Sequence, residues 1–212
     1  MPADALLALE PRKTPVQARS AVTVEAISEA TIQVLLSHGP ERLTTTRVAA
    51  RAGVSVGTLY QYYPNKRSLL FAVLENHLNR VAATVETACK NARHKPLAEM
   101  IRQVVEAFVD AKMERADVSV ALYRVSTELG GPELIKRVGQ RSRKAVSDML
   151  QTAVDVQPPP DRFVVETMLA AMTGVMRSLL EAGPSPAAVR KSREQLVLLC
   201  QSYLSAATAN RA

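Results

Sequence analysis

The 212-residue sequence has no tryptophan and only eight glycines against twelve prolines. This composition does not suit a turn-rich β sandwich. Apolar residues make up 47% of the chain and charged residues 22%, a globular balance that excludes a disordered or collagen-like chain. Alanine, leucine, arginine, glutamate and glutamine are plentiful and favour helix. We therefore expect an all-α fold.

Features of membrane, secreted and metal-binding proteins are also scarce. No uninterrupted apolar run approaches the roughly 18–20 residues of a membrane span, and the acidic residues among the first thirteen do not suit a signal peptide. Cys89 and Cys200 form no Cys-x-x-Cys pair, and His38, His77 and His94 show no metal-ligand spacing. We expect a soluble cytoplasmic protein without a metal or cofactor.

The formal net charge is +7, and positive charge is densest near the N-terminus. Between residues 11 and 80, nine Lys or Arg residues stand against four Asp or Glu residues, whereas from residue 81 onward eighteen stand against fourteen. This balance is compatible with a polyanionic partner. A second basic run lies within residues 136–144, and acidic neighbours favour a solvated face over a second nucleic-acid patch there.

Helix-period apolar residues recur in about nine stretches, and the early ones are short. The first ends at Gly39-Pro40. Thr44 is placed to cap a short helix that Gly53 ends, and Ser55 to cap another that Pro64 closes. Longer helices are expected over about 65–90, from 96, and over 117–129, 132–154, 161–181 and 186–209. Two short helices joined by a glycine turn predict a helix-turn-helix.

The second short helix has the residues that a DNA-reading helix needs. Its N-terminal residues are small enough for a major groove, and Leu59 and Tyr63 are expected on its inner face, against Val48 and Ala49. Hydroxyls and cations suit phosphates. We expect phosphate or base contacts from Thr44, Thr45, Thr46, Arg47, Ser55, Val56, Gly57, Thr58, Tyr60, Gln61, Tyr62 and Lys66. Half-buried core positions for the two tyrosines remain an alternative, as does a helical bundle without a DNA role.

Residues 44–49 (TTTRVA) and 52–66 (AGVSVGTLYQYYPNK) closely resemble the DNA-binding segment of the TetR/AcrR family of transcription regulators, and the resemblance extends over about residues 20–74. Tyr63 stands where the family usually has Phe. The resemblance implies a homodimeric repressor that leaves a palindromic double-stranded operator when a small molecule enters its C-terminal domain. The polar segment 1–19, which holds Pro2, Pro11 and Pro15, is expected to be a flexible arm. We expect a helix-turn-helix domain at 20–66 and a helical ligand-binding and dimerisation domain at 67–212.

The C-terminal part carries candidate ligand-binding and dimerisation residues. The apolar stretch 161–181 must be covered on two faces, so we expect it to form a two-fold four-helix interface with the last helix, where Leu180 and Leu196 would lie. Inward residues that would favour a hydrophobic effector, or equally an ordinary core, are Met100, Val104, Phe108, Tyr123, Met168, Met172 and Met176. Glu106 and Asp110 are expected to pair with Arg102 on the opposite side, which argues against a cationic ligand.

The motifs bear on three classes of function. A ligand-responsive repressor fits the pattern best. An enzyme would need a nucleophile–base arrangement, a phosphate loop or a paired-histidine motif, and none is found. A DNA-binding regulator without a small-molecule effector remains open, because periodicity does not reveal the volume of a pocket.

Overall fold

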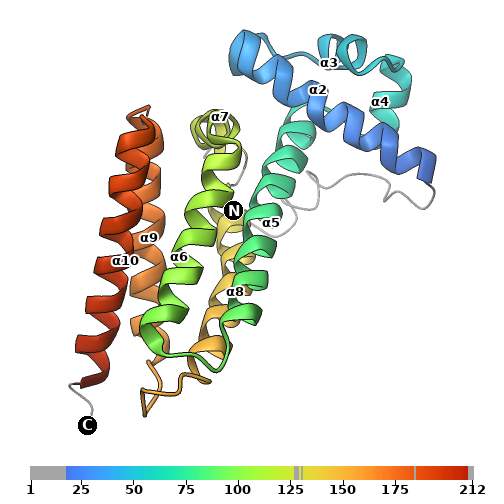
Figure 1. The fold of residues 1–212 in the computed structure, drawn as a ribbon. Coiled ribbons are helices and arrows are strands. Elements are labelled where there is room, and N and C mark those ends of the chain that lie inside the picture. The colour runs from blue at the N-terminus through green and yellow to red at the C-terminus, as the bar shows by residue number, and fades with distance from the viewer. Residues whose placement is uncertain (1–17, 127–128, 130, 184, 210–212) are drawn as a thin grey trace. The chain divides into compact units, whose positions relative to one another are not determined.

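The computed structural model describes residues 18–126, 129, 131–183 and 185–209, and this part of the chain forms nine α-helices and no strand (Figure 1). The all-α prediction is confirmed. The helices are α2 (Ala18–Arg42), α3 (Thr45–Ala52), α4 (Val56–Tyr62), α5 (Lys66–Ala92), α6 (Leu97–Glu114), α7 (Ala116–Ser126), α8 (Gly131–Leu150), α9 (Arg162–Glu181) and α10 (Pro186–Ala209).

The chain divides into two compact units. The first unit contains residues up to 78 together with 117–135, and the second contains residues 79–116 and 136–212. Helices α5 and α8 each contribute to both units. The arm expected at 1–19 lies outside the described residues, apart from residues 18 and 19 at the start of α2.

The first unit is organised around α2, α3 and α4, which pack in sequence order. Gly39 interrupts α2 with φ 75° and ψ 171°, a conformation that glycine adopts without strain, so the predicted break is present. The buried face of α2 carries Ile27, Ala30, Val34 and Leu35. These apolar residues recur at helical spacing, and their burial stabilises the packing of α2 on α3.

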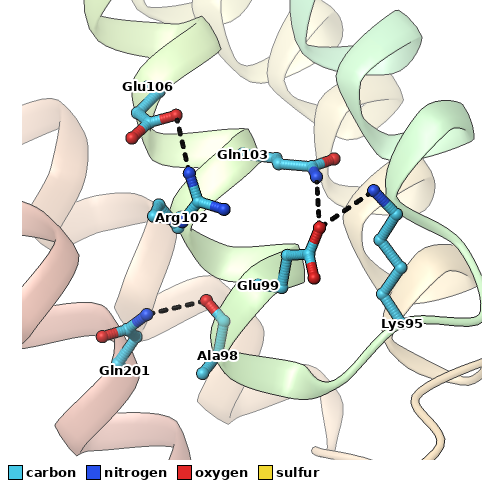
Figure 2. Close-up of polar contacts among 7 residues, drawn as sticks. All are labelled: Lys95, Ala98, Glu99, Arg102, Gln103, Glu106 and Gln201. Atoms are coloured by element: carbon cyan, nitrogen blue, oxygen red, sulfur yellow. Dashed lines mark hydrogen bonds and ion pairs between the residues drawn. The ribbon is translucent and has the colours of Figure 1, made fainter.

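The second unit is a bundle in which α10 packs against both α6 and α9 (Figure 1). Asp155 Oδ1 accepts a hydrogen bond from Leu97 N at 2.8 Å, which satisfies one of the free N–H groups at the start of α6. On α10, Gln201 Nε2 donates to the carbonyl of Ala98 at 2.7 Å (Figure 2). One continuous hydrophobic core joins helices α5, α6, α8, α9 and α10.

Polar contacts on the outer face of α6 partly match expectation. Glu99 accepts from Lys95 and Gln103 at 3.0 Å each, and Arg102 Nη1 lies 3.7 Å from Glu106 Oε2 (Figure 2). Asp110 does not pair with Arg102 as the sequence suggested. It accepts instead from Arg193 of α10, which the packing of α10 on α6 brings within reach.

Helix α9 is the only described helix that is long and apolar enough to cross a membrane by length and composition. This is weak evidence for a span, because the core helix of a soluble protein has the same composition. Val165, Met168, Met172 and Met176 of α9 are buried in the second unit's core, in keeping with that simpler explanation.

Candidate nucleic-acid interface and ligand core

The two short helices of the first unit begin at hydroxyl caps. Thr44 Oγ1 accepts from Arg47 N at 3.3 Å, and Ser55 Oγ accepts from Thr58 N at 2.9 Å. Each bond satisfies an N–H that would otherwise lack a partner in the first helical turn. Gly53 has φ 68° and ends α3 in the left-handed region. These local features fix the angle at which α4 leaves the turn.

Helix α4 has a clear inner and outer side. Leu59 and Tyr63 are buried, as are Val48 and Ala49 on α3, which confirms the predicted inner face. The side chains on the outer side are small or polar, and no long aliphatic side chain projects from it. Its exposed members are Ser55, Val56, Gly57, Tyr60 and Gln61. Thr58 is half-buried, and its hydroxyl lies 2.8 Å from Ser55 Oγ. Such a surface can enter a major groove.

Four of the expected phosphate-binding side chains make hydrogen bonds within the first unit. Lys66 Nζ donates to the carbonyl of Pro40 at 2.6 Å. Tyr60 Oη lies 3.2 Å from Thr45 Oγ1. The first contact joins α5 to α2 and the second joins α4 to α3, and each restricts the orientation of its side chain.

Arg47 and Tyr62 are held in the same way. Arg47 Nη1 donates to the carbonyl of Arg42 at 2.6 Å, and Tyr62 Oη donates to Ser20 Oγ at 3.3 Å. Tyr62 is half-buried, which agrees with the alternative weighed for it, whereas Tyr60 is 43% exposed. Thr44 and Thr46 are exposed.

Sequence reasoning missed the partners that anchor this surface. Ser20 lies 42 residues before Tyr62, and Arg51 Nε donates to Gln33 Oε1 at 2.6 Å across 18 residues. Helical periodicity gives no signal for contacts at such separations. Their common effect is to tie α2 to the helix-turn-helix.

The predicted ligand-binding residues fall in different places. Those of α6 and α9 belong to one hydrophobic core and are almost fully buried; they are Met100, Val104, Phe108, Met168, Met172 and Met176. Tyr123 is half-buried and belongs to the first unit, so it is separate from this set. The structure therefore brings six of the seven candidates into one core.

A buried cation near this core was not anticipated. Lys112 follows Met100, Val104 and Phe108 at intervals of four residues on α6, and its side chain is only 4% exposed. Its Nζ lies 6.0 Å from the centre of the Phe108 ring, within range of a cation–π contact. The spacing of four residues along α6 was the sequence signal that could have placed Lys112 beside Phe108.

The described residues offer little support for a metal site or a reactive thiol. They contain no group of three or more His, Cys, Asp or Glu side chains that could hold a metal ion. Burial raises the pKa of Cys89 to about 12 and that of Cys200 to about 11, so both thiols stay protonated at neutral pH. His77 Nε2 lies 2.9 Å from Ser119 Oγ, a structural contact inside the first unit.

Two short capped helices joined by a left-handed glycine, with a small polar face on the second, define a helix-turn-helix protein. Residues 27–73 match the family described as "Bacterial regulatory proteins, tetR family". Residues 96–204, just over half of the chain, match "Tetracyclin repressor-like, C-terminal domain". The chain therefore belongs to the TetR family of DNA-binding transcriptional regulators.

Similar proteins include several named regulators. The chain is 29% identical over 103 residues to the nucleoid occlusion factor SlmA of Pasteurella multocida, covering 49% of this chain and 51% of SlmA. It is 39% identical over 62 residues to the transcriptional repressor KstR of Mycolicibacterium smegmatis, covering 29% of this chain and 30% of KstR. The chain thus spans about half, or less, of the length of these curated relatives.

A solved structure extends the likeness to most of the chain. The fatty acid degradation regulator FadR from Bacillus halodurans superposes with a TM-score of 0.64 at 19% identity, covering 87% of this chain and 96% of that one. At this identity the match supports the fold alone.

Proposed function

We propose that this protein is a transcriptional repressor that binds a palindromic operator as a homodimer and is released by a small hydrophobic ligand. The DNA-binding part is supported by the small and polar residues exposed on α4, and by the four phosphate-binding candidates that are hydrogen-bonded within the first unit, Arg47, Tyr60, Tyr62 and Lys66. KstR, similar over 62 residues of the chain, is a named repressor with the proposed direction of regulation.

Exposed apolar residues on α9 and α10 support the homodimer. Val175 of α9 is 37% exposed, and Leu198 and Leu199 of α10 are 57% and 46% exposed. Gly174 precedes Val175 on α9 and has open space where a Cβ would be, which would allow a second helix to approach closely. A two-fold axis would cover the same face on both copies. We therefore place the dimer interface here.

The interface residues differ from those suggested by periodicity. Leu180 and Leu196 are each only 1% exposed and are buried within their own chain. A helix that is apolar on all sides must be covered on two faces. The sequence does not show which of these faces is covered by the helix's own domain.

The core of the second unit supports a hydrophobic ligand, because three methionines of α9 share it with Met100 and Phe108 of α6, and methionine side chains are adaptable. Release of DNA would require the ligand to favour the DNA-incompetent state by around 5 kcal/mol. A regulator without an effector is the second candidate. It is favoured by the tight burial of Met100 and Met176, each 0% exposed, in that same core.

The DNA-binding proposal is tested by selecting duplexes from a random pool and titrating the selected duplex by fluorescence anisotropy. We expect a palindromic site bound by two chains. Lys66→Gln removes a charge but keeps an N–H donor for Pro40. It should lower the slope of log K against log salt by about one per subunit.

The matched control is Lys191→Gln, which removes an exposed cation of α10 that is not part of the outer side of α4. It should leave the slope unchanged. Binding that selects no sequence, or one chain per duplex, would contradict the proposal. Apolar compounds that raise the melting temperature and weaken DNA binding together would support the effector. Their absence from a broad panel would favour the second candidate.

A further inference from the structure

A cleft of about 250 Å³ lies on the second unit, between α5 and α8. Sites for drug-sized ligands span roughly 300–1,000 Å³, so this cleft suits a smaller molecule. Its walls are strongly charged. Four cations and two carboxylates line it, namely Lys90, Arg93, Arg141, Lys144, Glu86 and Asp148.

Both carboxylates already have a cationic partner. Arg141 holds Glu86 through two hydrogen bonds of 3.0 Å and donates a third to Asn79 Oδ1 at 2.9 Å. Lys144 Nζ donates to Asp148 Oδ2 at 2.6 Å. The negative charge of the cleft is therefore neutralised by the two cations of α8.

The two cations of α5 remain. Within the described part of the chain, neither Lys90 nor Arg93 forms an ion pair, and both are exposed. Cys89, at the floor of the cleft, is 2% exposed. Burial raises the pKa of this thiol to about 12, and the positive charge of Arg93 nearby opposes that rise.

Helix dipoles act against an anion here but do not outweigh these cations. Helix α5 ends at Ala92 and α8 at Leu150, so both carbonyl ends lie close to the cleft. Each end is equivalent to roughly half a negative charge. Two such ends offset about one of the two unpaired positive charges, and the cleft keeps a net attraction for anions.

We propose that this cleft binds a compact dianion, a phosphate group or a short dicarboxylate, held by Lys90 and Arg93 of α5. The cleft shares no residue with the outer side of α4 or with the six candidate ligand-binding residues of the core. The basic run at 136–144 therefore serves two places. Arg141 and Lys144 line the cleft, whereas Arg143 pairs with Glu166 of α9.

The test is isothermal titration of the full chain, without DNA and at low salt, with inorganic phosphate, succinate and acetate. Phosphate or succinate should bind once per chain, and acetate about tenfold more weakly because it carries one charge. Lys90→Ala with Arg93→Ala should weaken the dianion about tenfold. Arg190→Ala with Lys191→Ala removes two exposed cations of α10 and should change affinity less than about twofold.

Asp148→Asn gives a gain that loss of structure would not produce. It removes a competing carboxylate and frees Lys144, so dianion binding should tighten about threefold. Binding of phosphate alone would assign a phosphoryl ligand, and binding of succinate alone a dicarboxylate. The proposal is overturned if neither binds, or if the Lys90/Arg93 variant binds like wild type. It is also overturned if that variant lowers only the salt slope of DNA binding, which would make the cleft a nucleic-acid surface.

Discussion

Replacing Gly57 with alanine should stabilise the fold while weakening DNA binding. Gly57 lies in α4, and a Cβ built there would be 3.7 Å from Ser55 Oγ, an ordinary van der Waals contact. Alanine is favoured over glycine inside a helix by roughly 0.5–1 kcal/mol. For a chain of this size that corresponds to a rise of about 1–4 °C in melting temperature.

The same methyl group would stand on the face that we assign to the major groove. Extra carbon atoms forced into a packed contact cost typically about 1–3 kcal/mol, which corresponds to a roughly 5- to 150-fold loss of affinity. The two effects have opposite signs, so a general loss of structure cannot produce both. The measurements are thermal unfolding followed by circular dichroism and anisotropy titration with the selected duplex.

Gly139→Ala is the matched control. Gly139 is exposed in the middle of α8, and a Cβ there meets nothing within 4 Å. This variant should gain similar stability and bind DNA as wild type. If Gly57→Ala is stabilised and still binds DNA with unchanged affinity, Gly57 does not lie against the duplex. If it is destabilised, our account of α4 is wrong.

Two further predictions concern assembly and alkaline stability. Leu198→Arg should give monomers in sedimentation at micromolar concentration and weaken DNA binding at least about tenfold. The control is Val154→Arg, at a residue that is 65% exposed and lies outside α9 and α10, which should stay dimeric. If Leu198→Arg is dimeric, the interface lies elsewhere. Unfolded thiols with a pKa of 9.0 ionise before the buried ones, whose pKa values are about 12 for Cys89 and about 11 for Cys200, so the free energy of unfolding measured in urea should fall as pH rises above about 9. A Cys89→Ala, Cys200→Ala chain should show less of this fall, and an equal fall would assign it to other groups.

The features predicted best from sequence are those determined within one helical turn. Thr44 and Ser55 cap through bonds to residues three positions later, and Gly53 ends α3 through its own φ angle. Burial of Leu59 and Tyr63 follows from helical periodicity once the caps fix the helix. Local physics alone determines these positions.

Features that depend on a neighbouring helix were predicted poorly. Arg102 reaches Glu106 one turn away, but Asp110 lies a further turn along and binds Arg193, 83 residues later. Periodicity placed Asp110 on the correct side of α6 but could not show that α10 would cross there. The exposed position of Leu198 and the burial of Leu196 have the same cause, because α6 and α9 decide which side of α10 is covered.

The anchoring bonds of the first unit bear on the energetics of the proposed DNA complex. Ordering a free, rotamer-rich side chain at an interface costs about 0.5–1.5 kcal/mol. Lys66 and Arg47 are held by backbone carbonyls, and Tyr60 and Tyr62 by hydroxyls, before any DNA is present. Four anchored side chains would avoid several kcal/mol of this cost per subunit. The Lys66 ammonium has three donors and uses one on Pro40, so two can still meet a phosphate without breaking the anchor. Within the proposed complex, the bonds that fix the first unit and the contacts that bind DNA are therefore compatible.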